Sequence, residues 1–248
     1  MRAKELWEAR WRVVILNPIG WLLALTMPFL FGLLQKGGKN VPGPALALLH
    51  YPTMAFGWFR EDLPELLLLY VIIWSVAQIT REWQTGSIEF LGQLPLTAGQ
   101  VALLKGLWGS AEISLVSLLS SAVLWIVSIA SGHHLPAAVF IVSSLLITVG
   151  FIAMVWLISL LAWALHSTYG VIILALAVYI VSVIAHSVRV LRPYSPITYM
   201  TNANPAAHLG TLWVHLGVDA AAALVLAWAA VAVAGRQEFG PNHGRDQV

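Results

Sequence analysis

Long apolar runs alternate with short polar connections along this chain, and the pattern predicts a bundle of membrane-spanning helices. A helix needs about 20 predominantly apolar residues to cross the hydrocarbon core of a bilayer. Three of the runs are shorter than this, and one is long enough to tilt or to carry an extra turn. The six runs lie at residues 19–34, 63–79, 107–130, 135–165, 169–186 and 211–234. We therefore expect an all-α membrane protein with six transmembrane helices, formed by residues 1–248 as a single domain.

The composition strengthens this expectation. Hydrophobic residues make up 59% of the chain and charged residues only 10%, whereas soluble domains carry roughly 25% charged residues. A soluble fold has no means of hiding so much apolar surface. The formal net charge of +2 is too small to indicate a nucleic-acid partner. The chain contains no cysteine, which excludes disulfides, thiolate metal sites and a cysteine nucleophile.

The positions of the lysine and arginine residues predict the orientation, because these residues concentrate on the cytoplasmic side of membrane proteins. With a cytoplasmic N-terminus, the cytoplasmic side carries Arg2, Lys4, Arg10, Arg12, Arg81, Lys105, Arg236 and Arg245. The outer side then carries Lys36, Lys39, Arg60, Arg189 and Arg192. Six spans place both termini in the cytoplasm, with residues 235–248 as a tail. We expect a multi-pass protein of a plasma membrane, of the bacterial inner-membrane kind.

The segments before the first span and outside the membrane have their own patterns. Residues 1–17 lack the apolar core and cleavage site of a signal peptide, and their tryptophans follow helical spacing. They predict an amphipathic helix in the headgroup layer, although a simple basic flank to the first span fits as well. The outer connection at 35–62 is apolar enough to lie in the interface. The connection at 187–210 predicts short helices or a partly re-entrant cap, shielded from lipid.

A polar segment at residues 82–96 stands between the second and third spans on the cytoplasmic side. Thr85 and Glu89 bracket a helix of about two turns, and Pro95 ends it because proline lacks the amide donor. Thr97 can cap the next helix, which runs through Lys105 into the third span. A short helix held between two spans acts as a lever on both. The residues alone leave open whether it does so or only anchors the loop in headgroups.

This segment resembles a known family. Glu82 followed by GSIEFLGQLPLTAGQVALLK at residues 86–105 is similar to the permease subunits of type-2 ATP-binding-cassette (ABC) transporters. The nearest kind is the compact permeases of gliding-motility and copper-enzyme-maturation exporters. In that family the short helix is the coupling helix, which sits in a cleft of the ATPase subunit. The resemblance assigns this role to Glu82, Trp83, Gly86, Ser87, Ile88, Glu89, Phe90, Leu91 and Pro95. Ser87 departs mildly from the family, where threonine is commoner.

The energy source implied by the resemblance is a separate polypeptide. No GxxxxGK[ST] loop occurs in the chain, so it does not cradle ATP as a P-loop ATPase does. We expect a non-enzymatic subunit with no cofactor of its own, with ATP and Mg²⁺ bound by two partner ATPases. The resemblance also implies a second permease copy or a paralogue. The apolar, tryptophan-rich composition favours export of an amphipathic drug, peptide or lipid-like substrate.

Ionisable and polar side chains within the spans are the remaining candidates for function, because such groups are costly in the membrane. Glu112 is a candidate buried charge in the third span, and Asp219 is one in the sixth. Asp219 has Arg189, Arg192 and His215 as candidate partners, and the sequence does not decide between such pairing and a substrate pathway. Ser114 and Ser117 belong to a stripe of serines that suits helix packing or, less directly, the lining of a path. No histidine spacing typical of a metal site occurs.

Three other functions compete with transport driven by ATP. A non-transporting assembly or sensory subunit could use the same fold. An intramembrane hydrolase would need a serine nucleophile with a positioned base, and no such motif is found. An ion-coupled secondary transporter would need charges at the midplane and broken helices in repeated halves, and the chain lacks that pattern.

Overall fold

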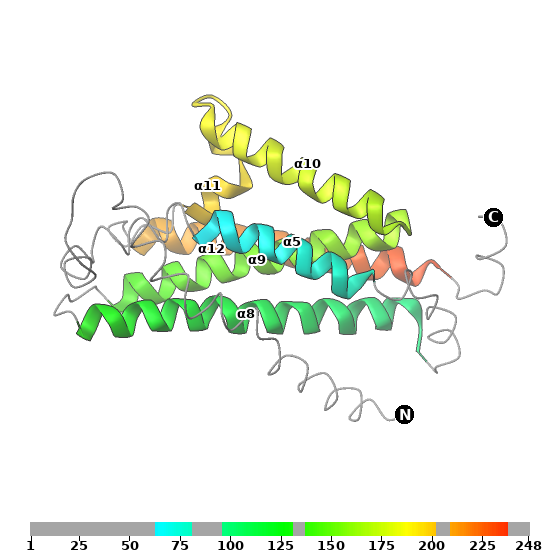
Figure 1. Ribbon diagram of the computed structural model, residues 1–248, viewed down its shortest axis with the longest axis horizontal. Helices are drawn as coiled ribbons and strands as arrows, with labels where there is room; N and C mark the ends of the chain where they lie inside the picture. Colours follow the sequence, from blue (N-terminus) through cyan, green and yellow to red (C-terminus); the bar gives the residue numbers. More distant parts are fainter. Residues whose placement is uncertain (1–62, 81–95, 131–136, 202–208, 238–248) are drawn as a thin grey trace, which may run out of the picture.

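The computed structural model describes residues 63–80, 96–130, 137–201 and 209–237, and all the regular structure in these ranges is helical (Figure 1). The prediction of an all-α protein is confirmed for this part of the chain. The predicted interfacial helix at 1–17, the first span at 19–34 and the segment 82–95 lie outside the described residues, as does most of the tail. The helices are α5 (Leu63–Ile79), α8 (Ala98–Ala130), α9 (Ala137–Leu165), α10 (Thr168–Ser187), η2 (Arg192–Tyr194), α11 (Pro196–Thr201) and α12 (Leu209–Gly235).

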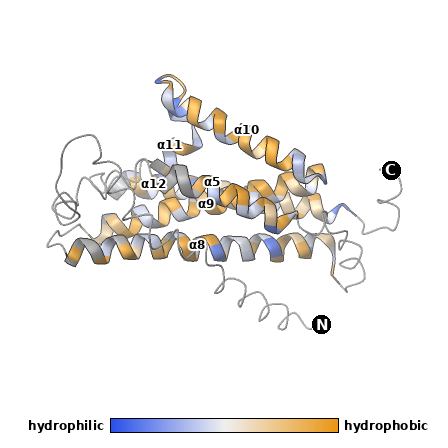
Figure 2. Cartoon of the chain, viewed as in Figure 1, coloured by the Kyte–Doolittle hydropathy of each residue, from blue (hydrophilic) through white to orange (hydrophobic). Residues whose placement is uncertain are grey.

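Four of these helices are long and apolar enough to cross a membrane. They are α8, α9, α10 and α12, which coincide with the third to sixth predicted runs. The helix α5 coincides with the second run and is shorter, at 17 residues. Apolar residues extend along the whole length of α9 and α10 (Figure 2). By length and composition the chain is therefore a helical membrane protein.

The long helix α8 begins well before the apolar run that it contains. Thr97 and Gln100 form a reciprocal cap: the Thr97 amide donates to Gln100 Oε1 at 2.9 Å, and the Gln100 amide donates to Thr97 Oγ1 at 3.2 Å. These bonds satisfy two amides that the first turn of a helix otherwise leaves unpaired. The sequence prediction that Thr97 caps a helix running through Lys105 is confirmed. With 33 residues, α8 is about 50 Å long, which exceeds a hydrocarbon core of about 30 Å.

The central helix of the bundle is α9, which packs against α12, α8 and α5. Its side chains Phe140, Leu146, Ile147, Phe151 and Ile158 are almost fully buried. By contrast, α10 leaves the bundle at an angle, and η2 and α11 lead the chain back to it (Figure 1). Most of the surface of α10 and α12 is exposed in the single chain. These two helices thus present their apolar faces to lipid or to other molecules in the membrane.

Helix ends that are distant in sequence meet at one end of the bundle, which we call the Lys105 end. Lys105 Nζ of α8 donates to the Ile79 carbonyl of α5 at 3.0 Å. A Cβ on Gly99 would lie 3.4 Å from the Gly235 Cα, which places the start of α8 beside the end of α12. Gln237 Nε2 donates to the Trp163 carbonyl near the end of α9 at 2.6 Å. Consecutive long helices therefore alternate in direction, as successive membrane spans must.

Candidate functional site

The nine residues that the sequence predicts to dock an ATPase lie outside the described residues. They are Glu82, Trp83, Gly86, Ser87, Ile88, Glu89, Phe90, Leu91 and Pro95. The structure does describe the two helices that flank them, α5 and α8. The geometry of these flanks determines how a force on residues 82–96 would reach the membrane.

Lys105 ties the two flanks together. Its side chain is only 8% exposed, and its ammonium donates to the Ile79 carbonyl at 3.0 Å. The last carbonyls of a helix have no partner within the helix, and a cation at this end is also favoured by the helix dipole. Next to it, Thr80 Oγ1 donates to the Val76 carbonyl at 2.7 Å. The end of α5 is therefore joined to α8 at a point about 10 Å after α8 begins.

Directly after Lys105 and one turn further along α8, two glycines allow α5 and α9 to pack closely against α8. A Cβ on Gly106 would lie 2.2 Å from Trp156 Cη2 of α9, closer than atoms can approach. A Cβ on Gly109 would lie 2.9 Å from Val155 Cγ1 and 3.4 Å from Trp74 Cζ3 of α5. Small residues permit such contacts between membrane helices. We did not single out these glycines from the sequence, although their spacing of three on an apolar helix was a usable signal.

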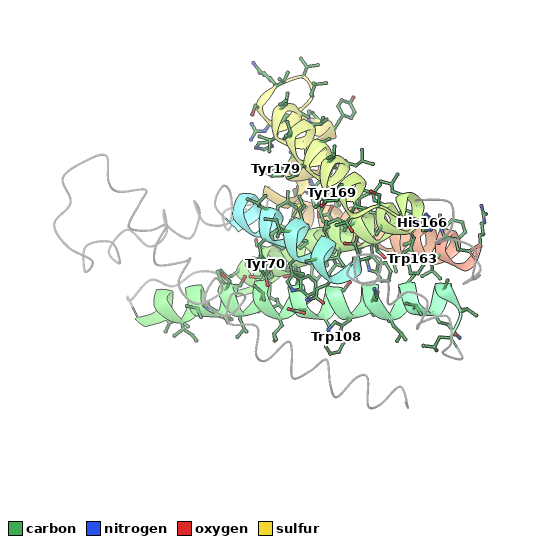
Figure 3. The ribbon with its side chains drawn as sticks, turned by 45° about the vertical axis from the view of Figure 1, so that its right-hand side comes forward. Tyr70, Trp108, Trp163, His166, Tyr169 and Tyr179 are labelled. Carbon is green, nitrogen blue, oxygen red and sulfur yellow. The ribbon has the colours of Figure 1, made fainter. Side chains whose placement is uncertain are left out.

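A second set of bonds joins α9, α10 and α12 at the same end. Gln237 donates to the Trp163 carbonyl, and its Oε1 accepts from His166 Nε2 at 2.8 Å. His166 has a φ of 52°, a left-handed conformation that turns the chain sharply before Ser167 caps α10. Figure 3 shows Trp163 and His166 where these helices meet. Gln237 could not be recognised from sequence, because its partners are more than 70 residues away.

Two members of the predicted serine stripe on α8, Ser114 and Ser117, form hydrogen bonds. Ser114 Oγ donates to the Ser110 carbonyl of its own helix at 2.6 Å. Ser117 Oγ and Thr148 Oγ1 of α9 share a hydrogen bond of 2.9 Å. Ser117 thus joins α8 to α9, whereas Ser114 bonds within α8.

The two predicted membrane carboxylates differ in their surroundings. Glu112 is buried on α8, with 4% of its surface exposed. Asp219 is partly buried on α12, and its Oδ2 has no hydrogen-bond partner among the described residues. Arg189 and Arg192 are exposed, and neither forms an ion pair with Asp219. The candidate pairing with these arginines is therefore not found in the structure.

His215 lies one turn before Asp219 on α12 and is equally unpaired. Its Nδ1 is enclosed and lacks a hydrogen-bond partner within the described part of the chain. The ring of Tyr199 from α11 lies 5.1 Å from the His215 ring, centroid to centroid, with the planes inclined by 57°. His215, Asp219 and Tyr199 thus form a second polar region, at the other end of the bundle from Lys105.

Other types of site receive no support in the described residues. No group of three or more histidine, aspartate or glutamate side chains is arranged to hold a metal there. Comparison with known proteins found no matching family model and no matching curated protein sequence. The class that the structure itself defines is a helical membrane protein with a braced Lys105 end and an unpaired polar region near α11.

Proposed function

We propose that this chain is the permease subunit of a type-2 ABC transporter. It exports an amphipathic substrate, and a separate P-loop ATPase docked on residues 82–96 supplies the energy. The motif from Glu82 to Lys105 supports this proposal, together with the alternating membrane-length helices. The absence of a phosphate-binding loop accords with an ATP site on the partner.

The observation that carries the proposal is the bond between Lys105 and the Ile79 carbonyl. A coupling element must pass a push to the membrane helices without yielding at its attachment points. Here the end of α5 is joined to α8 through a buried lysine about two turns after α8 begins, and the glycine contacts beyond it join α8 to α9. When residues 82–96 are displaced, the helices α5, α8 and α9 therefore move together.

The mechanism that follows is a two-state movement without chemistry in this chain. Closure of two ATPases on ATP shifts the segment 82–96 and with it the braced helices α5, α8 and α9. The helix α10 has few buried positions and packs less extensively on the bundle than α12 does, so it can change its neighbours at lower cost. ATP and the substrate each favour the conformational state to which they bind more tightly, as in any population shift.

The test is co-purification of the tagged chain from its native membranes in mild detergent. A P-loop ATPase should accompany the natural chain and be absent from the double variant Ile88→Asp with Glu89→Arg. A matched control makes the same kind of change at the exposed turn after α10, with Val190→Asp and Arg189→Glu, and should retain the ATPase. If a well-folded docking variant keeps the ATPase, or if none accompanies the natural chain, the proposal is wrong.

A further inference from the structure

The chain between α10 and α11 forms a tight hydrogen-bonded turn at residues 188–194, which we call the α10 tip. The Leu191 and Arg192 amides both donate to the Val188 carbonyl, at 3.0 and 2.9 Å, and the Tyr194 amide donates to the Leu191 carbonyl at 2.9 Å. Successive bonds of this kind fix the backbone of a turn. The tip stands clear of the other helices in the views of Figure 1 and Figure 3. Its side chains are therefore presented to the surroundings from a fixed frame.

Side-chain bonds hold the tip to the helices on either side of it. Ser195 Oγ donates to the Ser182 carbonyl of α10 at 2.7 Å. Thr198 Oγ1 of α11 donates to the Arg192 carbonyl at 2.6 Å. Its bond of 2.9 Å to His186 Nδ1 is therefore one that the imidazole N–H donates. These bonds use carbonyl, hydroxyl and imidazole groups, and no guanidinium group takes part in them.

The side chains of the tip combine positive charge with exposed apolar surface. Arg189 and Arg192 are both exposed. Val190 is 77% exposed and Tyr194 is 82% exposed. No aspartate or glutamate occurs in residues 113–218, so the tip has a net positive charge along its own stretch of chain. Exposed apolar side chains that adjoin charged ones are typical of a surface that meets a membrane or another molecule.

The length of α10 places the tip at a membrane surface. The helix has 20 residues and is therefore about 30 Å long, which matches the hydrocarbon core of a bilayer. It begins at the Lys105 end, after the sharp turn at His166 and the cap at Ser167. The tip follows its last turn directly and lies in the headgroup layer of the opposite face, which is the outer face in the predicted orientation. Tyrosine rings are common in this layer, and arginine side chains extend into it with their stems toward the acyl chains.

From this geometry we infer that the α10 tip binds the headgroup of an anionic phospholipid. Arg189 and Arg192 supply guanidinium groups, each of which can pair with two phosphate oxygens through parallel N–H···O bonds. Val190 and Tyr194 lie among the first carbons of the acyl chains and hold the tip at headgroup depth. Because the turn is already fixed, little backbone freedom is lost when the lipid binds. The inference goes beyond the proposed function, since neither an ATPase nor an export substrate enters it.

Other ligands with a phosphate group fit the tip less well. The headgroup of phosphatidylcholine carries its own ammonium, which offsets the attraction of its phosphate for Arg189 and Arg192. A free phosphate ion can pair with the two arginines but leaves Val190 and Tyr194 exposed to water. An anionic phospholipid satisfies both the charged and the apolar side chains.

The experiment measures lipid binding at the tip itself. The chain has no cysteine, so Ser187→Cys provides one thiol for a fluorophore directly before the tip. The purified chain in mild detergent is titrated with phosphatidylglycerol that carries a quenching nitroxide near its headgroup. Quenching should saturate, and unlabelled phosphatidylglycerol should reverse it, whereas sodium phosphate should not. Phosphatidylcholine with the same nitroxide should need at least a tenfold higher mole fraction for equal quenching.

Substitutions of the two arginines, made in the same labelled chain, test their role. Arg189→Gln with Arg192→Gln should weaken the binding of phosphatidylglycerol by at least tenfold, and each single substitution by about fivefold, the scale of one basic residue near a membrane surface. Arg189→Lys with Arg192→Lys keeps the charge and should restore most of the binding. Arg236→Gln is the matched control, because Arg236 is also exposed but follows α12 at the Lys105 end. It should leave quenching at the tip unchanged.

Three results would overturn the inference. The double glutamine variant could bind phosphatidylglycerol as tightly as the natural arginines do, phosphatidylcholine could quench equally well, or sodium phosphate could reverse the quenching. Size-exclusion profiles establish that each variant is folded, and the lysine variant separates loss of charge from loss of structure. No ATPase is needed for this measurement, so its failure is distinct from a failure of the co-purification experiment.

Discussion

At the scale of single residues, substitutions at Asp219 and at Gly106 should change stability: Asp219 Oδ2 has no hydrogen-bond partner among the described residues, and Gly106 lies in tight contact with Trp156. Removing the Asp219 carboxylate removes the free-energy cost of a buried polar group without a partner. Adding an atom at Gly106 creates a steric clash. The two therefore predict changes of opposite sign.

Replacing Asp219 with leucine should raise the thermal stability of the isolated chain. The change removes a partly buried oxygen that has no hydrogen-bond partner in the described part of the chain, and an unsatisfied group of this kind costs about 1–3 kcal/mol. The measurement is thermal unfolding in detergent, followed by the loss of the monodisperse size-exclusion peak. As a matched control, Ser117→Ala breaks the bond to Thr148 and should lower stability by about 0.6 kcal/mol. A marked destabilisation by Asp219→Leu would show that the carboxylate has a partner within the protein.

Replacing Gly106 with alanine should destabilise the fold by about 1–3 kcal/mol, the usual cost of overpacking. The added Cβ would lie 2.2 Å from the ring of Trp156, which is itself buried and cannot move freely. Gly217→Ala is the control, because no atom lies within 4 Å of a Cβ there. It should leave stability unchanged or raise it through helix propensity. Equal melting temperatures for the two variants would contradict the close contact between α8 and α9.

At the scale of elements, the end of α5 depends on a residue of another helix. Lys105 of α8 reaches the Ile79 carbonyl across 26 residues of sequence. The pair closes the flanks of the predicted coupling segment without using any residue of that segment. A substitution at Lys105 therefore removes this link without changing the predicted coupling segment itself.

The variant Lys105→Met should loosen the last turn of α5 while leaving α8 helical. It keeps the aliphatic stem of the side chain but removes the donor to Ile79, so faster hydrogen exchange is expected at residues 76–80. In the proposed complex with an ATPase, that ATPase should still bind, but substrate-stimulated ATP hydrolysis should fall. Leu104→Met changes the exposed residue next to Lys105 and should leave exchange in α5 unaltered. Unchanged hydrogen exchange at residues 76–80 in Lys105→Met would show that Lys105 does not stabilise the end of α5.

At the scale of the whole molecule, the helices whose ends lie side by side are the ones that can move together. The start of α8 lies against the end of α12 at the Lys105 end, while Gly210 lies at the opposite end of α12. This grouping agrees with the alternating topology expected from the apolar runs. It can be tested without removing native cysteines, because the chain has none.

The pair Gly99→Cys with Gly235→Cys should be joined in the membrane by a short bis-methanethiosulfonate reagent, a crosslink that reductant cleaves. A Cβ on Gly99 lies 3.4 Å from the Gly235 Cα, but a Cβ on Gly235 has no atom within 4 Å, so a spacer is used in place of a direct disulfide. The measurement is the mobility of protease-cut fragments on gels with and without reductant. Gly99→Cys with Gly210→Cys is the control and should give no crosslink, since α12 is about 40 Å long. A crosslink in the control but not in the test pair would reverse the direction assigned to α12.

The sequence alone determined that the chain is helical and membrane-embedded, because a polypeptide in lipid must satisfy its own backbone and must present apolar side chains. It also located five of the described helices and the Thr97 cap, since both depend on residues close together in the chain. The docking residues at 82–95 remain a prediction from resemblance.

Only the tertiary structure decided which polar groups have partners. Lys105 found a carbonyl on α5, Ser117 found Thr148 and Gln237 found Trp163 and His166, while Asp219 and His215 found none among the described residues. These outcomes depend on contacts between residues 26 to more than 70 positions apart, about which local patterns carry no information. The physical reason is that hydropathy specifies whether a side chain is buried, whereas packing specifies what it is buried against.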